Sequence, residues 1–238
     1  MIQAVVFDLF GTLVQQFPLG RFEESLRRMG QAVGLQFEDI FTAWTQETSV
    51  RRHTGGFPSF RDELLAICES RGIRPSEEGL TVAVHIRWEF TRSILVPRHD
   101  AVATLREVRS RGLRTGLISD CSLEVPELWR ETPFAGQFDV TVFSCCVGTK
   151  KPDPRIYATA CEALGVLPSG CVYVGDGFSR ELHGAESVGM RPLLLQVPSE
   201  PLPQTDEWEG HGWEGERIPA LGEIVNLLDV AGSQRGKP

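Results

Sequence analysis

The sequence predicts an α/β protein: a Rossmann-like three-layer core built on a parallel sheet, with an all-helical segment inserted near the beginning of the chain. Residues 4–7 form a short apolar run of β-branched and aromatic residues, as in a buried parallel strand. Residues 16–95 show only helical periodicity, and from residue 98 onward strand and helix patterns alternate. We therefore expect a core domain of residues 1–15 and 96–238, and a helical domain of residues 16–95.

The inserted segment contains four stretches in which apolar residues recur at three- and four-residue steps. The last of them opens with Ser76, a favoured N-cap residue, followed by acidic residues that suit the first turn of a helix. Arg51-Arg52-His53 is a candidate contact for an anionic substrate, although an exposed basic turn is the simpler interpretation. The expected helices span residues 19–29, 37–44, 59–71 and 76–88.

The remainder of the chain shows the alternation that places helices on both faces of a parallel sheet. The expected strands span residues 113–119, 138–143, 171–174 and 192–196, and the expected helices span residues 101–111, 152–164, 179–188 and 218–228. Residues 198–216 are rich in Pro, Gly, Glu and Trp, and we expect them to form a long surface loop.

Charge and cysteine content limit the possible environments and partners. The net charge of −8 argues against nucleic acid and anionic membranes as partners, and an anionic substrate would need a local cation. No apolar run approaches the roughly 18 residues of a membrane span. The six cysteines show no metal-type spacing, and the first strand follows Met1 directly. We expect reduced core thiols in a cytoplasmic protein.

Two carboxylates follow apolar strands at the point where each strand should end. Asp8 follows residues 4–7, and Asp176 follows the strand that ends at Gly175. Ligand sites of open α/β sheets lie outside the carboxyl ends of the strands. The two carboxylates could therefore share Mg²⁺, which prefers oxygen ligands. Taken alone, each Asp could equally well cap a turn.

A hydroxyl and a lysine stand at two further places in the chain where a strand ends or a helix begins. Ser119 and Asp120 end the strand of residues 113–119, where a hydroxyl can bind a phosphate oxygen or merely cap a helix. Lys150 and Lys151 precede a proline that restricts the backbone, which favours a placed Lys151 over a solvated lysine pair. A lysine beside carboxylates would keep them ionised and neutralise an anionic substrate.

Together these four segments resemble the motifs of the haloacid dehalogenase superfamily of hydrolases. Residues 8–12, Asp-Leu-Phe-Gly-Thr, resemble the first motif, Ser119 the second, and Lys151-Pro152 the third. Gly175-Asp176 with Glu181 resembles the fourth. Each motif is weak alone, but four in order are specific. The resemblance covers nearly the whole chain and implies that the helical insert is a cap.

The resemblance implies a role for each matching residue. Asp8 would be the nucleophile and form an aspartyl intermediate. Its side chain, the backbone carbonyl of Phe10 and Asp176 would hold Mg²⁺, and Glu181, in place of the more usual Asp, would support the metal or Lys151. The residues that would bind the phosphoryl group or other parts of the substrate are Thr12, Ser119, Asp120 and Lys151.

One residue departs from the phosphatase pattern. Phosphatases of this superfamily usually carry a second Asp two residues after the nucleophile, as general acid and base, and here that residue is Phe10. An aromatic residue there resembles the dehalogenase branch, which is metal-free. That branch usually has Asn where this chain has Asp120 and near the fourth motif, where it has Asp176. The first and fourth motifs therefore point to different branches.

We accordingly expect an Mg²⁺-dependent phosphatase that acts on a small phosphorylated metabolite through an aspartyl-phosphate intermediate. The first alternative is a 2-haloacid dehalogenase or another carbon–halogen hydrolase, which would take a halogenated substrate. The second is a catalytically impaired protein of the same fold that binds a ligand or a partner. The sequence identifies neither the substrate nor the oligomeric state.

Overall fold

The core of the protein is a six-stranded parallel sheet with the strand order β3-β2-β1-β4-β5-β6. The structure is a computed structural model that describes residues 1–16, 18–203, 205–206 and 208–233. The strands are β1 (Ala4–Phe7), β2 (Arg114–Ser119), β3 (Val140–Phe143), β4 (Cys171–Gly175), β5 (Arg191–Leu195) and β6 (Glu216–Ile218). The α/β fold class predicted from the sequence is confirmed, and β1 lies in the middle of the sheet between β2 and β4.

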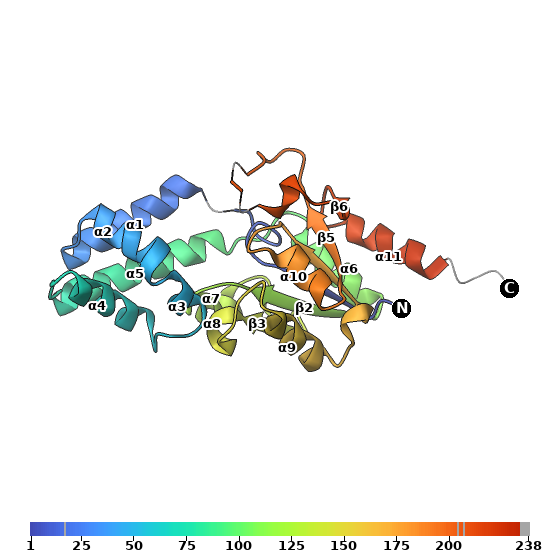
Figure 1. Cartoon of the computed structure of the whole chain (residues 1–238), viewed down its shortest axis with the longest axis horizontal. Helices are drawn as coiled ribbons and strands as arrows, with labels where there is room; N and C mark the ends of the chain where they lie inside the picture. Colours follow the sequence, from blue (N-terminus) through green and yellow to red (C-terminus); the bar gives the residue numbers. More distant parts are fainter. Residues whose placement is uncertain (17, 204, 207, 234–238) are drawn as a thin grey trace.

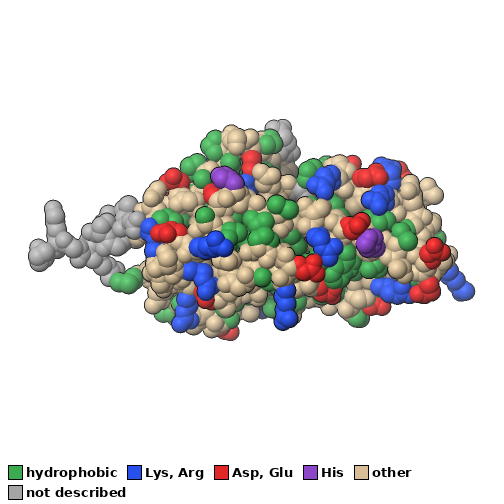
Figure 2. Space-filling model, turned by 180° about the vertical axis from the view of Figure 1, so that it is seen from behind, with side chains coloured by type: hydrophobic (Ala, Val, Ile, Leu, Met, Phe, Trp, Pro, Cys, Tyr) green, Lys and Arg blue, Asp and Glu red, His purple; other side chains and the backbone are tan. Residues whose placement is uncertain are grey.

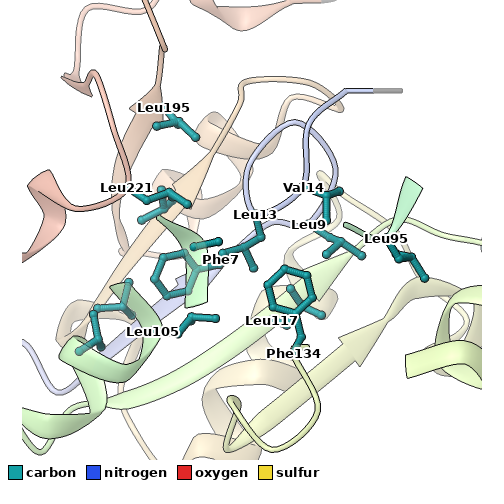
Figure 3. Packing of buried hydrophobic residues seen from close by; sticks show 14 of the residues in the cluster. Phe7, Leu9, Leu13, Val14, Leu95, Leu105, Leu117, Phe134, Leu195 and Leu221 are labelled. Atoms are coloured by element: carbon teal, nitrogen blue, oxygen red, sulfur yellow. The ribbon is translucent and has the colours of Figure 1, made fainter. Parts of the chain in front are cut away.

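Helices cover both faces of this sheet, as Figure 1 shows. In β1, Val5 and Phe7 contribute to one buried cluster and Ala4 and Val6 to the other, because successive side chains of a strand point to opposite faces. The first cluster is drawn in Figure 3, where Phe7, Leu105 and Leu117 lie together between the sheet and helix α6 (Ala101–Ser110). The sheet is therefore buried on both sides, as its apolar strand sequences predict.

The helices of the core follow the strands in the expected alternation. Helix α9 (Pro154–Leu164) packs against β2 and β3, and α10 (Glu181–Ser187) against β4 and β5, while α6 lies on the opposite face with α11 (Glu223–Ser233) beside it. The shorter core helices are α7 (Glu124–Leu128), η2 (Trp129–Glu131), α8 (Ser144–Val147), η3 (Pro168–Gly170) and η4 (Glu209–His211).

Between β1 and α6 the chain forms a separate group of helices, on the left in Figure 1. They are α1 (Leu19–Val33), α2 (Phe37–Thr42), the π-helical turn η1 (Ala43–Glu47), α3 (Ser49–His53), α4 (Phe60–Ser70) and α5 (Glu77–Ile94). Ser59 and Ser76 cap α4 and α5 by accepting a hydrogen bond from a backbone N–H of the first turn. These helices bury a hydrophobic cluster of their own around Leu26, Ile40 and Leu64.

The two chain segments that join the helical group to the sheet lie side by side. Val14 and Pro97 form an antiparallel β-bridge, and the backbone N–H of Arg98 donates to the carbonyl of Leu13 at 2.8 Å. The Arg98 guanidinium also donates to the Gly11 carbonyl at 2.7 Å and pairs with Glu200. Hydrogen bonds therefore connect these two segments directly to the loop that follows Asp8.

Two sequence-based predictions of local structure are wrong. The segment 198–216 is not simply a surface loop: Trp208 and Trp213 are buried, η4 forms within it, and residue 216 begins the edge strand β6. The last helix therefore begins at Glu223 rather than at residue 218. Polar composition predicted exposure here, but the two indole rings pack over the sheet and α10 in the second core cluster.

The basic stretch Arg51-Arg52-His53 is likewise not an exposed turn. It lies in α3, and Arg52 is 6% exposed and forms an ion pair of 2.7 Å with Glu63, which is 1% exposed. Of the six cysteines, five are buried and Cys146 is exposed, and none forms a disulfide. Within the described residues, no helix is long and apolar enough to cross a membrane.

Candidate active site at the carboxyl ends of β1, β2 and β4

The candidate site lies where three neighbouring strands end. Asp8 follows β1 directly, and its backbone N–H donates to the Val174 carbonyl of β4 at 2.9 Å, which fixes it to the neighbouring strand. Ser119 ends β2 on the other side of β1, and Asp176 follows β4. The sheet order thus brings Asp8 together with two groups that each lie more than 100 positions further along the sequence.

Lys151 lies at the centre of the site. Its Nζ donates to Asp8 Oδ1 at 2.5 Å and to Glu181 Oε2 at 2.6 Å, and its backbone N–H donates to Asp120 Oδ1 at 3.0 Å. Lys151 is 4% exposed, and burial alone would favour its neutral form. The carboxylates of Asp8, Glu181 and Asp120 outweigh burial and hold the pKa of Lys151 well above its usual range. The lysine is therefore a fixed buried cation.

Glu181 anchors Lys151 from the first residue of α10. Besides the lysine, Oε2 accepts from the Tyr173 hydroxyl at 2.7 Å, and Oε1 accepts from the Gly177 backbone N–H at 3.0 Å. The Tyr157 hydroxyl donates to the Glu181 carbonyl at 3.0 Å. Both carboxylate oxygens are therefore engaged by protein donors. The two tyrosines were not among the predicted site residues, because each looks like an ordinary apolar member of its element.

Asp176 faces Asp8 across the end of the sheet. Its Oδ2 accepts from Gln16 Nε2 at 2.6 Å and its Oδ1 from the Phe178 backbone N–H at 3.1 Å. Burial, followed by the charges of Glu181 and Asp8, raises the pKa of Asp176 well above its usual range. Gln16 is also not predictable from the sequence, because it stands just after the first motif in a segment with no periodic signal.

The carboxylates fit a divalent metal ion with oxygen ligands. One ligand atom from each of Asp8, Asp176 and Glu181 lies within 4.8 Å of the others, and all three residues are buried. The backbone loop approaches so closely that a Cβ at Gly11 would lie 1.8 Å from Asp176 Oδ2. Three carboxylates around one lysine leave an excess of negative charge, which a hard cation would balance.

Among the described residues, the buried polar atoms of the site that have no hydrogen-bond partner include Asp8 Oδ2, Thr12 Oγ1, Ser119 Oγ and Asp120 Oδ2. Burial raises the pKa of Asp8 to about 7, and the neighbouring Lys151 limits the rise. An unpaired buried hydroxyl costs folding free energy, so such atoms at the end of a sheet indicate groups kept for a ligand.

A cavity of about 340 Å³ adjoins the site between the sheet and the helical group. From the core it is lined by Phe10, Asp120 and Cys121, and from the helical group by residues that include Arg52 and Arg87. Asp120 lies 3.9 Å from Lys150 through Oδ2, and burial raises the pKa of its carboxyl group. Phe10 therefore presents an aromatic ring to the space where a phosphatase acid would be expected.

The sequence is similar to several proteins that are named as hydrolases. It is 30% identical to the glyceraldehyde 3-phosphate phosphatase of Methanopyrus kandleri over 207 residues, which cover 82% of this chain and 84% of that protein. It is 38% identical to the phosphoserine phosphatase of Thermus thermophilus over 226 residues, with 82% and 88% covered. The human haloacid dehalogenase-like hydrolase domain-containing protein 3 is 25% identical and matches 99% of this chain.

Solved structures show the same fold. A 2-haloacid dehalogenase of Pseudomonas syringae superposes with a TM-score of 0.70 at 23% identity, covering 97% of this chain and 100% of the other. A phosphatase of the same fold from Thermococcus onnurineus gives a TM-score of 0.64 at 21% identity, with 95% and 98% covered. A family model, haloacid dehalogenase-like hydrolase, matches residues 2–189. The chain therefore belongs to the haloacid dehalogenase-like hydrolase family.

Proposed function

We propose that this hydrolase is an Mg²⁺-dependent phosphatase of small phosphorylated metabolites. The observation that carries the proposal is Asp8: Lys151 occupies one of its carboxylate oxygens, and Oδ2 has no partner in the described part of the chain. Thr12 and Ser119 contribute buried hydroxyls that have no partner in the described chain, and such hydroxyls suit the binding of phosphoryl oxygens. The relatives named for glyceraldehyde 3-phosphate, phosphoserine and phosphorylated carbohydrates support the substrate class.

In this proposal Asp8 attacks the phosphorus atom. The bond between phosphorus and the ester oxygen breaks, the leaving oxygen departs as an alkoxide or phenolate that takes its proton from solvent, and an aspartyl phosphate forms on Asp8. Lys151 keeps Asp8 oriented and offsets the negative charge, while the hydroxyls of Thr12 and Ser119 donate to the phosphoryl oxygens. Water then attacks the phosphorus atom, releasing phosphate and restoring the carboxylate.

Mg²⁺, when bound, would neutralise charge on the phosphoryl group and allow it to approach Asp8. We assign its protein ligands to Asp8, Asp176 and the backbone carbonyl of Phe10. Glu181 belongs to the same carboxylate cluster, but its oxygens already accept from Lys151, Tyr173 and Gly177. We therefore propose that Glu181 supports the metal indirectly, by holding Lys151.

We also propose that residues 16–95 act as a cap domain over a core of residues 1–15 and 96–238. Helices α3 and α5 of this segment form one wall of the cavity beside Phe10 and Asp120. A cap in this position would exclude water from the reacting groups and contact the leaving group. The unpaired buried thiols suit a reducing compartment, which supports a cytoplasmic location.

A carbon–halogen hydrolase is the second candidate, because Phe10 provides no proton for a leaving oxygen and a halide needs none. In such an enzyme Asp8 would attack carbon and form an ester. The two acids Asp120 and Asp176 speak against it, since they would repel the carboxylate of a 2-haloacid. A catalytically impaired protein that only binds its ligand is the remaining alternative.

The deciding experiment measures product release from a panel of phosphate esters, acyl phosphates and 2-haloacids, with Mg²⁺ and with a chelator. We expect phosphate release that requires Mg²⁺ and is lost in Asp8→Asn, a variant of nearly equal volume. Halide release that persists in the chelator would favour the second candidate. Absence of turnover on the entire panel would favour a binding protein.

A further inference from the structure

The cavity beside Phe10 contains a charged group that the proposed chemistry does not use. Arg87, on α5, is 8% exposed, and its Nε donates to Glu124 of α7. Its Nη2 donates to the Ser122 hydroxyl at 3.1 Å. Its third nitrogen, Nη1, is buried and has no hydrogen-bond partner in the described chain. Arg87 is one of the residues that line the cavity, so this unpaired nitrogen belongs to a side chain of the cavity wall.

A second unsatisfied donor stands on the same face of the same helix. Thr91 follows Arg87 by four residues, the spacing at which helical side chains are neighbours. Thr91 is 1% exposed and lines the cavity, and its Oγ1 also has no partner among the residues described. Buried polar groups are rarely left unpaired, so two such donors at one cavity wall indicate a ligand that accepts both hydrogen bonds.

The charges around the cavity favour an anionic acceptor. Burial, then Arg52, Lys150 and Arg87, lowers the pKa of His53 to about 3, and Glu124 opposes them. His53 also lines the cavity, so the net field of these groups at this part of the wall is positive, although each cation has a carboxylate partner: Glu63 for Arg52, Asp120 for Lys150 and Glu124 for Arg87. Asp120 is the anion on the opposite wall, and Lys150 lies 3.9 Å from its carboxylate.

Much of the remaining wall is aromatic and apolar, although Thr45, Ser49 and Ser122 also line it. Phe10, Phe22, Trp44 and Phe90 line the cavity together with Ile94 and Val125. The Arg87 guanidinium carbon itself lies 4.8 Å from the ring centre of Trp44. A volume of about 340 Å³ is within the range of small-molecule sites. The shape and lining suit a compact apolar or aromatic body with one polar end.

We infer that the leaving group of the substrate carries a carboxylate, which Arg87 Nη1 and the Thr91 hydroxyl bind, while its apolar body packs against the aromatic wall. The inference rests on the proposed function, since it places the phosphoryl group at Asp8. It names the substrate class more narrowly: a phosphate monoester of a carboxylated, largely apolar alcohol or phenol. Arg87 and Thr91 are then specificity residues that touch the substrate away from the reacting bond.

The test compares two matched esters, 4-carboxyphenyl phosphate and 4-carbamoylphenyl phosphate, which differ in charge at the distal end. We expect the wild-type KM to be about tenfold or more lower for the carboxylate, the size of one hydrogen bond to a charged group. The same selectivity should appear in calorimetric binding of the two corresponding benzylphosphonates, which cannot be hydrolysed at the phosphorus–carbon bond.

Variants identify the residues responsible. Thr91→Val should reduce the carboxylate preference severalfold, and the double variant Arg87→Gln/Glu124→Gln, which leaves no unpaired buried charge, should abolish it. The control is Arg52→Gln/Glu63→Gln, which removes a buried pair formed entirely within the helical group. In the control the preference should persist, because the guanidinium of Arg52 is already engaged by Glu63, Thr48 and Trp44.

The outcomes separate this inference from the proposed function. Equal KM and equal phosphonate binding for the two probes, or loss of the preference in the control, would overturn the inference even if both esters are hydrolysed. Selective phosphonate binding that depends on Arg87, without hydrolysis of either ester, would support the binding site and contradict the proposed function.

Discussion

At the scale of single residues, we propose that Phe10 limits which leaving groups the enzyme can expel. A placed general acid contributes about 10²–10⁴-fold, and the ring of Phe10 cannot donate a proton. We predict that acyl and aryl phosphates, whose leaving groups need little protonation, are hydrolysed far faster than alkyl phosphates. Phe10→Asp should raise the alkyl rate by about 10²-fold and leave the aryl rate less affected. Steady-state rates on the paired esters measure this.

Equal wild-type rates on alkyl and aryl phosphates would mean that another acid is present. Asp120 lines the same cavity as Phe10, and burial raises the pKa of its carboxyl group, which favours the protonated form. In that case Asp120→Asn should abolish alkyl turnover. If alkyl turnover survived this substitution, our account of the leaving-group side would be wrong.

We predict that Asp176 raises the affinity for a metal ion at a cost in the stability of the metal-free protein. It is buried close to Asp8 and Glu181, and the carboxylates outnumber the single lysine. The raised pKa of Asp176 means that folding either adds a proton to this carboxyl group or buries its charge, and Asn avoids that cost, so we predict a metal-free Asp176→Asn protein that is more stable at neutral pH by about 1 kcal/mol or more. The same change should reduce the rise in melting temperature caused by Mg²⁺. Calorimetry with and without Mg²⁺ tests both effects, with the exposed Glu24→Gln as the control.

His53 should make stability sensitive to acid. Burial and three cationic neighbours lower its pKa to about 3, whereas an unfolded histidine titrates near 6.5. Between these values the unfolded state binds more protons, so this contribution to stability is lost as the pH falls from about 6.5 toward about 3. We predict that His53→Gln loses about 1–2 kcal/mol less stability than the wild type between pH 7 and pH 4.5. Urea unfolding of both proteins at the two pH values measures these losses. Equal losses of stability in the wild type and in His53→Gln would contradict the prediction.

At the scale of elements, the loop after β1 depends on Gly11. Its φ is +82°, and a Cβ there would lie 1.8 Å from Asp176 Oδ2 and 2.6 Å from Gln16 Nε2. Gly34 has a similar φ of +80°, but a Cβ there would meet only Ile73 Cγ2, at 3.9 Å. Both Ala variants should lose about 1 kcal/mol from backbone strain.

The two variants should differ in activity, because Gly11→Ala displaces a carboxylate of the site and Gly34→Ala does not. We predict at least a tenfold loss of kcat and weaker Mg²⁺ binding for Gly11→Ala, and nearly wild-type kcat for Gly34→Ala. Thermal unfolding and steady-state kinetics give both quantities. Similar activities in the two variants would show that the close approach of this loop to Asp176 is unimportant.

The strands and long helices could be predicted because their patterns are local. β1 and α5 are examples: an apolar run ends at Asp8, and Ser76 caps a helix that keeps one period for several turns. The structure of the segment 198–216 could not be predicted, because the burial of Trp208 depends on residues far away in the sequence. One of them is Asp176, whose carbonyl accepts a hydrogen bond from the indole N–H of Trp208 at 2.7 Å. Arg52 is a second case, since only tertiary structure reveals its pairing with Glu63.

At the scale of the whole molecule, the sheet order assembles the site. The predicted convergence of Asp8 and Asp176 follows from two strands that end in carboxylates, and the structure places these strands side by side. The roles of Tyr173 and Gln16 could not be read from the sequence, because a core tyrosine and a loop amide have no distinctive spacing. The cavity wall around Arg87 could not be predicted either. It is formed jointly by the helical group and the core, and no local sequence pattern shows that these two parts meet.

Charge is organised locally rather than over the entire surface. The net charge is −8, yet Figure 2 shows Lys, Arg, Asp and Glu side chains interspersed over the face that it presents. The cations that matter for an anionic substrate are instead buried or beside the cavity, as Lys151 and Arg87 are. An acidic protein can thus bind an anion, because short-range pairing outweighs the screened field of distant surface charges.

The most direct test of the account is to look for the phosphoryl group on Asp8. The enzyme with Mg²⁺ would be mixed with an aryl phosphate, quenched in acid within one turnover, and its peptides mapped by mass spectrometry. We predict an aspartyl phosphate at Asp8, accumulating because Phe10 offers no base for its hydrolysis, and absent in Asp8→Asn or after chelation. Rapid ester hydrolysis with no phosphoryl group on Asp8 would contradict the account.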